Sequence, residues 1–313
     1  MDRFDAMTVF ARVVETGSFT RAALTLGMSK TSVTQLVQQL EAQLRVRLLH
    51  RTTRKVNVTA DGAVYYERVL AILADVLDAE TSLPSADTRP RGRLRIDVPS
   101  PLASMVLVPA LPRFHALYPD IQLDLGASDR PVDVIRENVD CVLRGGPLRD
   151  GSLAARHIAD LTLGVYAAPT YLAQAGMPAH PRELDEDRHR VVGFRWASTG
   201  RNVPLALVRG EEEVTVRGRY TLSLDEGNAY LAAGVAGMGV LWLPDYMARP
   251  HAARGELLRL FDDWRIAPMP LYAAYAPHRH VSPRLRAFID WVAALMDEVA
   301  PVQRPPLRHG APS

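Results

Sequence analysis

The sequence predicts a multidomain α+β protein, in which an N-terminal winged helix-turn-helix and a long linker helix precede a C-terminal two-lobed α/β domain. Three observations lead to this fold class. Three helical segments and a basic hairpin-like segment fill the first sixty residues, one long helical stripe follows, and strands alternate with helices beyond a proline-containing hinge. A chain of 313 residues is also long enough to hold more than one hydrophobic core.

The helix-turn-helix is predicted by two short helical segments joined by a tight turn within residues 19–41. Ser18 or Thr20 is the candidate N-cap of the first segment, and Gly27 stands where the chain must leave that helix with positive φ. Ser29 is placed to cap the second segment. Ahead of both, an apolar stripe at helical spacing predicts another helix: Phe4, Met7, Phe10, Val13 and Val14.

The helix that begins after Ser29 has one apolar and one polar side, because its residues turn by about 100° each. The apolar side carries Val33, Leu36, Val37, Leu40 and Leu44. The polar side carries Lys30, Thr31, Thr34, Gln35, Gln38 and Glu41. Hydrogen-bond donors dominate the polar side, which suits a helix lying in the major groove of DNA. An amphipathic helical hairpin inside a bundle would show the same periodicity, so the flanking residues must decide between the two interpretations.

The residues after this helix favour DNA binding. Residues 45–62 contain a short apolar pair, a basic segment with alternating Val56 and Val58, and a new helix start, which together predict a β-wing. Residues 1–60 hold nine Lys or Arg against four Asp or Glu, a net charge of +5, so the rest of the chain carries 2 − 5 = −3. Three cations of the wing would lie along the phosphate backbone beside the groove: Arg51, Arg54 and Lys55.

The first sixty or so residues resemble the DNA-binding domain of the LysR-type transcriptional regulators. The resemblance rests on FARVVETGSFTRAA from Phe10, SKTSVTQLVQQLE from Ser29 and, most specifically, LLHRTTRKVNVTADG from Leu48. This chain departs from the family pattern at Thr34–Gln35, where the family has Ser followed by Arg or Lys, and at Arg45, where the family has Gly. The candidate DNA-binding residues are Thr20, Lys30, Thr31, Ser32, Thr34, Gln35, Gln38, Arg51, Arg54 and Lys55.

Composition narrows the class of protein further. Hydrophobic residues make up 48% and charged residues 23% of the chain, as in ordinary soluble globular proteins. No apolar run is long enough to span a bilayer and the start MDRFD is not a signal peptide, so we expect a cytoplasmic protein without membrane contacts. The single cysteine, Cys141, excludes a disulfide framework, and its apolar VDCVL context favours a packed thiol over a redox sensor.

A long helix is predicted from Thr59, its candidate N-cap, toward the hinge. Tyr66, Leu70, Leu73 and Leu77 recur on this helix at helical spacing. We expect the stripe to pack against a second copy of itself, because little else nearby would bury it. In LysR-type regulators the corresponding linker helix forms an antiparallel dimer. Packing within one subunit is the alternative, and the assembly is expected to be a homodimer or a tetramer built from two dimers.

Residues 84–92 form a polar, proline-containing hinge, after which the pattern changes to βαβ alternation and implies a mainly parallel sheet. Strands are predicted at 93–99, 121–128, 141–146, 161–168, 189–194, 239–244 and 271–277, with a hairpin at 205–223. Helices are predicted at 102–119, where Pro109 and Pro112 should interrupt the helix, and at 132–139, 169–176, 228–237 and 283–300.

These elements divide the chain into a winged helix-turn-helix at residues 1–58 and a linker helix with its hinge at 59–88. The effector-binding domain follows at 89–301, with its first lobe at 89–161 and 267–301 and its second lobe at 162–266. We expect residues 302–313 to be a disordered tail. Two α/β lobes joined by crossing strands match the effector domain of LysR-type regulators, which resembles periplasmic solute-binding proteins.

The sequence contains no recognisable catalytic constellation. Gly234, Gly237 and Gly239 form GxxGxG at the end of a helix rather than the dinucleotide fingerprint that opens one. The P-loop, HExxH and GxSxG motifs are absent from the sequence. His278 and His280 are spaced wrongly for a metal pair on one helix face. We therefore expect neither enzymatic activity nor a metal or cofactor.

A ligand cleft is the better expectation, because small molecules bind between α/β lobes at strand ends and helix N-termini. Placement in the resembling fold selects Ser100, Leu102, Ala103, Ser128, Arg144, Gly145, Gly146, Phe194, Arg195 and Asp225 as effector-binding candidates. The Ser100 hydroxyl, the backbone N–H groups near Leu102 and Ala103 and the Arg144 guanidinium suggest an anionic effector. Structural roles compete with this interpretation, with Ser100 as a helix cap, Arg144 in an ion pair and Phe194 in the core.

We therefore predict a LysR-type regulator that reads DNA through its helix-turn-helix and responds to a small molecule between the two C-terminal lobes. Its expected partners are double-stranded DNA, the effector, further copies of itself and RNA polymerase. Two alternatives come from other classes. One is a cytoplasmic solute-binding protein with an added helical bundle, and the other is an enzyme with a nucleic-acid-binding domain. The basic wing disfavours the first, and the missing catalytic motifs disfavour the second.

Overall fold

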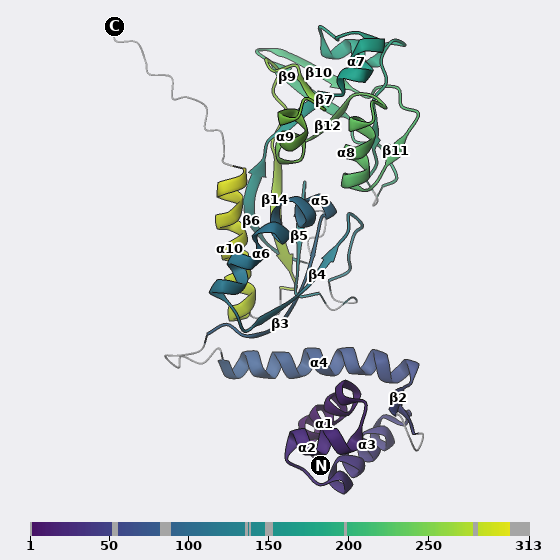
Figure 1. Cartoon of the computed structure of the whole chain (residues 1–313), viewed down its shortest axis with the longest axis vertical. Coiled ribbons are helices and arrows are strands. Elements are labelled where there is room, and N and C mark those ends of the chain that lie inside the picture. Colours follow the sequence, from purple (N-terminus) through teal and green to yellow (C-terminus); the bar gives the residue numbers. More distant parts are fainter. Residues whose placement is uncertain are drawn as a thin grey trace, which may run out of the picture. The chain divides into compact units, whose positions relative to one another are not determined.

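The computed structural model describes residues 2–51, 56–81, 89–134, 137, 139–147, 153–196, 199–277 and 281–300 of the chain. The chain divides into two compact units, Met1–Gly92 and Arg93–Ser313. Figure 1 shows the N-terminal unit as a small helical domain and the C-terminal unit as sheets flanked by helices. Within the described ranges, every helix is too short or too polar to cross a membrane.

The N-terminal unit begins with the three expected helices: α1 (Arg3–Thr16), α2 (Phe19–Leu26) and α3 (Lys30–Leu44). Of the two candidate caps of α2, Ser18 is the one used, because its hydroxyl accepts a hydrogen bond from the Arg21 N–H. Ser29 accepts from the Ser32 N–H in the same way and starts α3. Gly27 has φ +64°, which confirms the left-handed turn between the two helices.

The apolar sides of these helices form one core. Phe10, Val13, Val33, Val37 and Leu40 are fully buried, as their helical spacing predicts. Two neighbouring residues behave otherwise. Leu24, an apolar residue of α2, is 78% exposed. Glu41, expected on the polar side of α3, is only 6% exposed and accepts hydrogen bonds from the Leu48 and Leu49 N–H groups.

The wing is a two-stranded antiparallel sheet of β1 (Leu49–Arg51) and β2 (Val56–Val58). The long helix α4 (Ala60–Thr81) follows directly. Thr59 is its cap, because the Thr59 Oγ1 accepts a hydrogen bond from the Gly62 N–H at 2.9 Å. The same hydroxyl donates to the Arg47 carbonyl at 2.7 Å, so the helix start is attached to the chain that leads into the wing.

The stripe on α4 lies partly against the chain's own N-terminal core. Tyr66, Leu70 and Leu73 are partly buried there, and the Tyr66 ring lies 6.4 Å from the Phe10 ring between centroids. The side chain of Leu77 lies outside the described part of the structure. A different row of α4 faces away from this core: Val64 is 66% and Ile72 38% exposed. Packing within one subunit, the alternative interpretation of the stripe, therefore accounts for at least part of its burial.

The C-terminal unit contains a five-stranded sheet with strand order β4-β3-β5-β14-β6. Its strands are β3 (Gly92–Val98), β4 (Ile121–Ala127), β5 (Cys141–Gly145), β6 (Ala154–Leu161) and β14 (Met269–Tyr275). β3 and β5 are parallel, but β14 runs antiparallel to both β5 and β6. β3, β5 and β6 therefore run in one direction and β14 runs opposite to them, because the chain leaves this lobe through β6 and returns beside it through β14. The expectation of a mainly parallel sheet holds for these strands and fails in the second lobe, whose three-stranded sheet is antiparallel.

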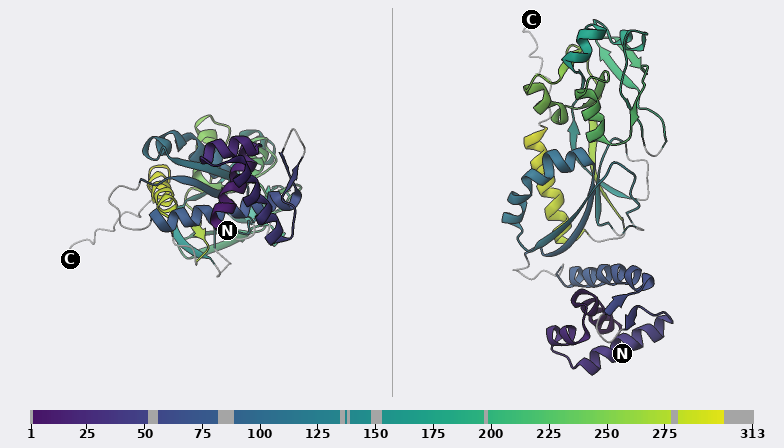
Figure 2. Two further views of the ribbon diagram at one scale, coloured as in Figure 1. Left: turned by 90° about the horizontal axis from the view of Figure 1, so that it is seen from below. Right: turned by 45° about the vertical axis from the view of Figure 1, so that its right-hand side comes forward.

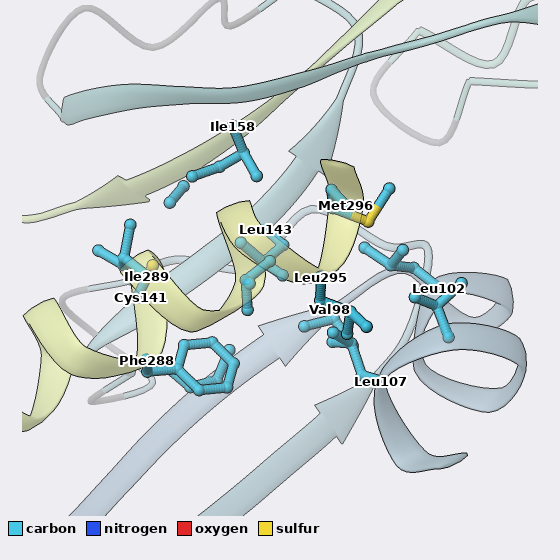
Figure 3. Close-up of a cluster of buried hydrophobic side chains, with 14 of the residues drawn as sticks. Val98, Leu102, Leu107, Cys141, Leu143, Ile158, Phe288, Ile289, Leu295 and Met296 are labelled. Carbon is cyan, nitrogen blue, oxygen red and sulfur yellow. The ribbon is translucent and has the colours of Figure 1, made fainter. Parts of the chain in front are cut away.

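One face of this sheet is covered by α6 (Val108–Leu117) and α10 (Pro283–Val299), as both views of the ribbon show (Figures 1 and 2). Figure 3 shows part of the hydrophobic core of this lobe, to which the sheet contributes Leu143 and Ile158 and α10 contributes Phe288 and Ile289. Cys141 lies in this core with no exposed surface, and burial raises the pKa of its thiol. The sequence interpretation of Cys141 as a packed thiol is thus confirmed.

Two predicted helices of this lobe differ from the structure. The helix after β3 is continuous: α5 (Ser100–Leu102) leads through a π-helical turn (Ala103–Leu107) into α6. The expected interruption near Pro109 and Pro112 is wrong, because the helix widens into the π-turn ahead of the prolines. Within the predicted helix 132–139, the described residues form turns and irregular chain, with hydrogen bonds from the Glu137 N–H to the Asp133 carbonyl and from the Val139 N–H to the Val134 carbonyl.

The second lobe is built on a three-stranded antiparallel sheet of β12 (Leu241–Pro244), β7 (Leu163–Ala167) and β13 (Leu258–Leu260). It also holds the hairpin of β9 (Leu205–Arg209) and β10 (Glu212–Val216) and the short parallel pair of β8 (Gly193–Phe194) and β11 (Ser223–Leu224). The helices are α7 (Pro169–Ala175), a 3₁₀ turn (Pro181–Asp185), α8 (Gly227–Val235) and α9 (Asp245–Ala253). The sequence did not predict α9.

Candidate functional site

The polar side of α3 is the candidate nucleic-acid surface of the N-terminal unit. Lys30, Thr31, Gln35 and Gln38 are exposed along it, and Thr20 is exposed on α2. Glu41 is the one carboxylate in α3, and it is buried. The exposed side of α3 therefore carries one lysine and several amide and hydroxyl donors without a negative charge, as phosphate and base-edge recognition require.

Two hydroxyls on this surface also support the helix itself. The Thr34 Oγ1 donates to the Lys30 carbonyl at 2.8 Å. The Ser32 Oγ lies 2.8 Å from the Ser29 Oγ at the N-cap. Both residues are half-buried. The Thr34 O–H is engaged as a donor within the helix, and either hydroxyl can donate in the Ser29–Ser32 pair, so Lys30, Gln35 and Gln38 are the main donors that this surface offers.

The end of α3 carries a feature that the sequence interpretation missed. The Glu41 Oε1 accepts the Leu48 N–H at 2.9 Å and the Leu49 N–H at 3.1 Å, where the chain enters the wing. Arg45, which ends α3, has φ +55°, so an arginine occupies the left-handed position that usually favours glycine. The glycine that LysR-type regulators have at this position could have predicted the left-handed turn at Arg45.

The wing cations fall largely outside the described residues. Arg51 pairs in β1 opposite Val56, but its side chain is not described, and Arg54 and Lys55 lie outside the described ranges. His50 and Asn57 are paired across the hairpin and both are exposed. The phosphate contacts assigned to Arg51, Arg54 and Lys55 stay a prediction.

The C-terminal unit holds a cavity of about 200 Å³ between its two lobes. The first lobe contributes the ends of β3, β4 and β5 with the start of β14: Pro99, Pro101, Asp129, Arg144, Gly145 and Met269. The second lobe contributes Leu163, Phe194, Arg195, Trp196, Val203, Asp225, Gly227, Tyr230, Trp242, Leu243, Pro244, Tyr246 and Met247. The lining is therefore mainly apolar and aromatic with four charged side chains, a composition typical of small-molecule sites.

Half of the effector-binding candidates line this cavity: Arg144, Gly145, Phe194, Arg195 and Asp225. Ser100, Leu102, Ala103, Ser128 and Gly146 do not line it. Leu102 and Ala103 belong to the core of the first lobe. Gly146 lies behind the cavity wall, where an added Cβ would come within 3.1 Å of the Trp196 ring.

The backbone donors expected to bind an anion are already engaged. The Ser100 N–H donates to the Asp129 Oδ1 at 3.1 Å, and the Ala103 N–H donates to the Pro99 carbonyl at 2.9 Å. The sequence interpretation took the Ser100 hydroxyl and the N–H groups near Leu102 and Ala103 as available, and for the Ala103 N–H it is wrong. The carboxylate that takes the Ser100 N–H comes from a residue that the sequence interpretation did not select.

Each charged group of the cavity wall has a protein partner. The Arg144 Nη2 lies 2.5 Å from the Asp97 Oδ1 of β3, and the Arg195 Nη2 lies 2.8 Å from the Asp225 Oδ2. The Arg195 hydrogen bond lowers the pKa of Asp225. Burial raises the pKa of Asp129, and the hydrogen bonds from Gly227 and Ser100 only partly oppose that shift. The ion pair anticipated for Arg144 as its structural alternative is therefore present.

Aromatic side chains of the second lobe make the rest of the wall. The Phe194 ring contacts the Tyr230 ring edge-on, with 5.2 Å between centroids, and lies 6.4 Å from the Trp196 ring. Trp242 and Tyr246 add further rings. Burial raises the pKa of Tyr246, and the Asp129 charge adds to that shift. The sequence interpretation missed Tyr230, Trp242 and Tyr246, because strand and helix positions that are distant in sequence contribute these rings.

Among the described residues, no cluster of three His, Cys, Asp or Glu side chains could hold a metal ion. His278 and His280 lie outside those residues. Gly234 and Gly237 serve packing and turns: a Cβ on Gly234 would collide with Leu241 at 2.4 Å, and Gly237 has φ +77°.

A winged helix-turn-helix followed by a two-lobed α/β unit with an apolar cleft is the architecture of a ligand-responsive DNA-binding regulator. Comparison with known families agrees. Residues 4–63 match the family described as "Bacterial regulatory helix-turn-helix protein, lysR family", and residues 87–297 match the "LysR substrate binding domain". The chain therefore belongs to the LysR family of transcriptional regulators, whose members bind DNA and effector ligands and form oligomers.

Similar proteins span the whole chain. An HTH-type transcriptional repressor of Pseudomonas aeruginosa (strain UCBPP-PA14) is 36% identical over 309 residues, which cover 98% of this chain and 96% of that protein. The structure of CrgA, a LysR-type transcriptional regulator from Neisseria meningitidis, has a TM-score of 0.58 at 33% identity and covers 93% of this chain and 97% of its own. The full-length structure of the Vibrio cholerae virulence activator AphB has a TM-score of 0.56 at 30% identity, with 93% and 98% covered.

Proposed function

We propose that the exposed side of α3 reads base edges in the major groove and that the cleft between the C-terminal lobes binds the effector that modulates this reading. One observation carries the DNA-reading part. The single carboxylate of α3, Glu41, is turned into the domain, so the exposed side of the helix presents Lys30, Gln35 and Gln38 without any negative charge. Carboxylates on that surface would repel phosphates and reject most base edges.

The proposed division of labour follows residue chemistry. Gln35 and Gln38 are suited to bidentate hydrogen bonds with adenine, and Lys30 is suited to guanine or a phosphate. Thr20, Thr31, Ser32 and Thr34 would add contacts at the edge of the groove. The wing cations Arg51, Arg54 and Lys55 would hold phosphates and set the orientation of the unit on DNA.

The experiment compares specific and random DNA for Gln35→Ala. A bidentate contact discriminates between bases by about 1–3 kcal/mol, so the variant should lose roughly tenfold or more in affinity for the operator and little for random DNA. The matched control is Gln39→Ala, which changes a neighbouring exposed glutamine of α3 outside the proposed contacts. Equal losses on both DNAs would remove the base-reading role of Gln35.

For the cleft, the proposal is that Arg144, Gly145, Phe194, Arg195 and Asp225 contact the effector and that Ser100, Leu102, Ala103, Ser128 and Gly146 shape the walls around it. An effector that binds one arrangement of the lobes more tightly than another shifts the population toward that arrangement, and only this difference in affinity can change DNA binding. The relatives include proteins named as repressors and as activators, and either sign of regulation is compatible with the mechanism.

We also propose a homodimer joined through α4. Val64, Arg68 and Ile72 follow each other at intervals of four residues on this helix, and all three are exposed. This row, with the half-buried Val76, is a better interface than the stripe of Tyr66, Leu70 and Leu73, which partly packs inside the subunit. Pairing of two such dimers into a tetramer and contact with RNA polymerase are further proposals.

The same proposal assigns the protein no catalytic activity and a cytoplasmic location. Similarity to transcriptional regulators over nearly the whole chain supports the first, and binding to chromosomal DNA supports the second. A thermal-shift screen with small organic compounds, followed by product analysis, tests the absence of catalysis. A regulator is stabilised by its ligand and leaves the ligand unchanged, whereas recovery of a converted product would contradict the assignment.

A further inference from the structure

Asp129 is a carboxylate shared by the two lobes of the C-terminal unit. It follows β4 in the first lobe, and its Oδ1 accepts the Ser100 N–H at the start of α5 at 3.1 Å. Its Oδ2 accepts the Gly227 N–H, the first residue of α8 in the second lobe, at 2.6 Å. One side chain thus connects the beginnings of two helices across the wall of the cleft.

This position is where an anionic ligand would find its donors. Helix N-termini offer unpaired N–H groups and the positive end of the helix dipole, so they attract carboxylates and phosphates. Here both ends already hold a carboxylate of the protein. Gly227 also approaches the first lobe closely, because a Cβ on Gly227 would lie 2.4 Å from the Pro101 ring and 3.4 Å from the Asp129 Oδ2.

The cations of the cavity wall are likewise committed to carboxylates. Arg144 is paired with Asp97 and Arg195 with Asp225, at 2.5 and 2.8 Å. Glu226 lies close enough to Asp129 to raise the pKa of Asp129 further, after burial as the main cause. The two guanidinium groups of the lining are thus neutralised by protein carboxylates, whereas the Asp129 carboxylate of the lining is held by the N–H groups of Ser100 and Gly227, so an external anion would lack a counter-charge.

We propose that this cleft selects a small organic cation, an ammonium group carried on an apolar or aromatic body, and that Asp129 is the residue that determines this charge preference. The ammonium group would lie at the Asp129 side of the cavity, and the apolar body would lie against Phe194, Trp196 and Tyr246. Aromatic faces attract cations as well as apolar groups, so the same wall serves both parts of the ligand. The inference rests on the proposed effector cleft and replaces the anionic effector expected from the sequence.

The test uses three probes of one shape and different charge on the full-length protein at neutral pH: benzylamine, benzyl alcohol and benzoate. Calorimetric titration should rank benzylammonium at least tenfold tighter than benzyl alcohol and benzoate weakest. Asp129→Asn should reduce the affinity for benzylammonium at least tenfold and leave that for benzyl alcohol within about twofold. Asp120→Asn is the matched control, since Asp120 is exposed and outside the cavity lining, and it should leave all three affinities unchanged.

A second variant keeps the test informative if Asp129→Asn folds poorly. Asp129→Ala leaves the Ser100 and Gly227 N–H groups without their carboxylate, so acetate should raise the Tm of this variant in a saturable way and should not do so for the wild type or with chloride. An equal response of the wild type to acetate would contradict the role of Asp129 as an internal anion.

Tighter binding of benzoate than of benzylamine to the wild type would overturn the charge preference and would leave the cleft as an effector site. Binding of benzyl alcohol without binding of benzylamine would also overturn the charge preference and leave the cleft as an effector site. If none of the three probes binds, the inference of an ammonium-selective pocket fails, while a gel shift of the same preparation on operator DNA reports separately whether the proposed regulator function stands.

Discussion

At the scale of single residues, the most informative side chain is Glu41. A helical wheel places it on the polar side of α3, yet it is buried and its Oε1 accepts the N–H groups of Leu48 and Leu49. The carboxylate thereby fixes the path from α3 into the wing and removes a negative charge from the proposed DNA surface. Glu41 thus stabilises the start of the wing and also leaves the exposed side of α3 without a carboxylate.

Glu41→Ala should destabilise the protein, because two buried N–H groups lose their acceptor and a cavity forms. Leaving buried donors unsatisfied costs about 1–3 kcal/mol. Glu41→Gln keeps an oxygen acceptor and should lose less than half as much. Urea unfolding of the full-length variants measures both. Equal stability of Glu41→Ala and wild type would show that the two hydrogen bonds do not hold the wing.

Glu256 gives a prediction for acid. Hydrogen bonds from Arg254 and then His251 lower the pKa of Glu256 from 4.5 to about 2. A carboxyl whose folded pKa is depressed contributes stability that is fully present above pH 4.5 and is lost as pH falls through about 2. Glu256→Gln should therefore lower the Tm at pH 7 and not at pH 2, where the carboxyl is largely protonated in wild type as well. The effect at pH 7 should be slight, because solvent screens the exposed ion pair of Glu256 with Arg254.

The measurement is a series of thermal melts from pH 7 to pH 2 on wild type, Glu256→Gln and the control Glu211→Gln, which changes an exposed glutamate in the β9–β10 turn. The Tm difference between wild type and Glu256→Gln should shrink toward acid. A difference that stays constant over this range would rule out the assigned pKa shift.

At the scale of elements, the junction between the wing and α4 shows how closely the backbone is packed. A Cβ on Gly62 would lie 2.0 Å from the Leu48 carbonyl oxygen, since the first turn of α4 lies directly on the chain leading into β1. The Thr-x-x-Gly pattern at this helix start therefore has a physical reason. Thr59 supplies the cap and Gly62 allows the close approach.

Gly62→Ala should destabilise the N-terminal unit by about 1–3 kcal/mol or more, because backbone atoms rather than a flexible side chain must move. The control is Gly27→Ala, where no atom lies within 4 Å of the added Cβ and only the positive φ of +64° opposes the change. In denaturant unfolding, Gly62→Ala should have a lower free energy of unfolding than Gly27→Ala. The reverse order would mean that the junction can relax without loss.

The same helix provides the test of self-association. Ile72 is 38% exposed on α4, whereas the adjacent Leu73 is partly buried against the N-terminal core. Ile72→Glu should shift the protein from dimer to monomer in sedimentation velocity at micromolar concentration with little change in Tm. Leu73→Glu should lower the Tm instead, because it places a charge in the core. A dimer that survives Ile72→Glu would place the interface elsewhere.

At the scale of the whole molecule, local sequence signals predicted the N-terminal unit well. Serine caps, Gly27 and the apolar stripe of α3 act over a few residues, so periodicity and cap chemistry suffice to locate them. The burial of Glu41 could not be predicted in this way, because tertiary contacts rather than helical phase decide its exposure.

The C-terminal unit was harder to predict from sequence, because its sheet order and its cleft depend on contacts between residues that are distant along the chain. β6 and β14 are more than 100 residues apart and yet pair along their length. Asp129 was missed for the same reason: its importance comes from the Gly227 N–H, 98 residues further along the chain. Arg144 was located at its strand end, but its partner Asp97 on β3 could not be foreseen from periodicity.

The buried state of Cys141 also bears on the whole molecule. It is the only cysteine of the chain, and it lies in the core of the first lobe with a raised thiol pKa. A reactive sensor thiol needs exposure and a stabilised thiolate, and neither is present at Cys141. The cleft is therefore the better candidate than a thiol for the site at which this regulator senses its signal.

The central claim is that this chain recognises a DNA sequence through α3. The most direct test is fluorescence anisotropy of the full-length protein with its own promoter fragment and with a scrambled fragment of equal length and composition, at physiological salt. The account predicts tighter binding to the promoter by a factor of roughly a thousand or more. Equal affinity for the two fragments would contradict it.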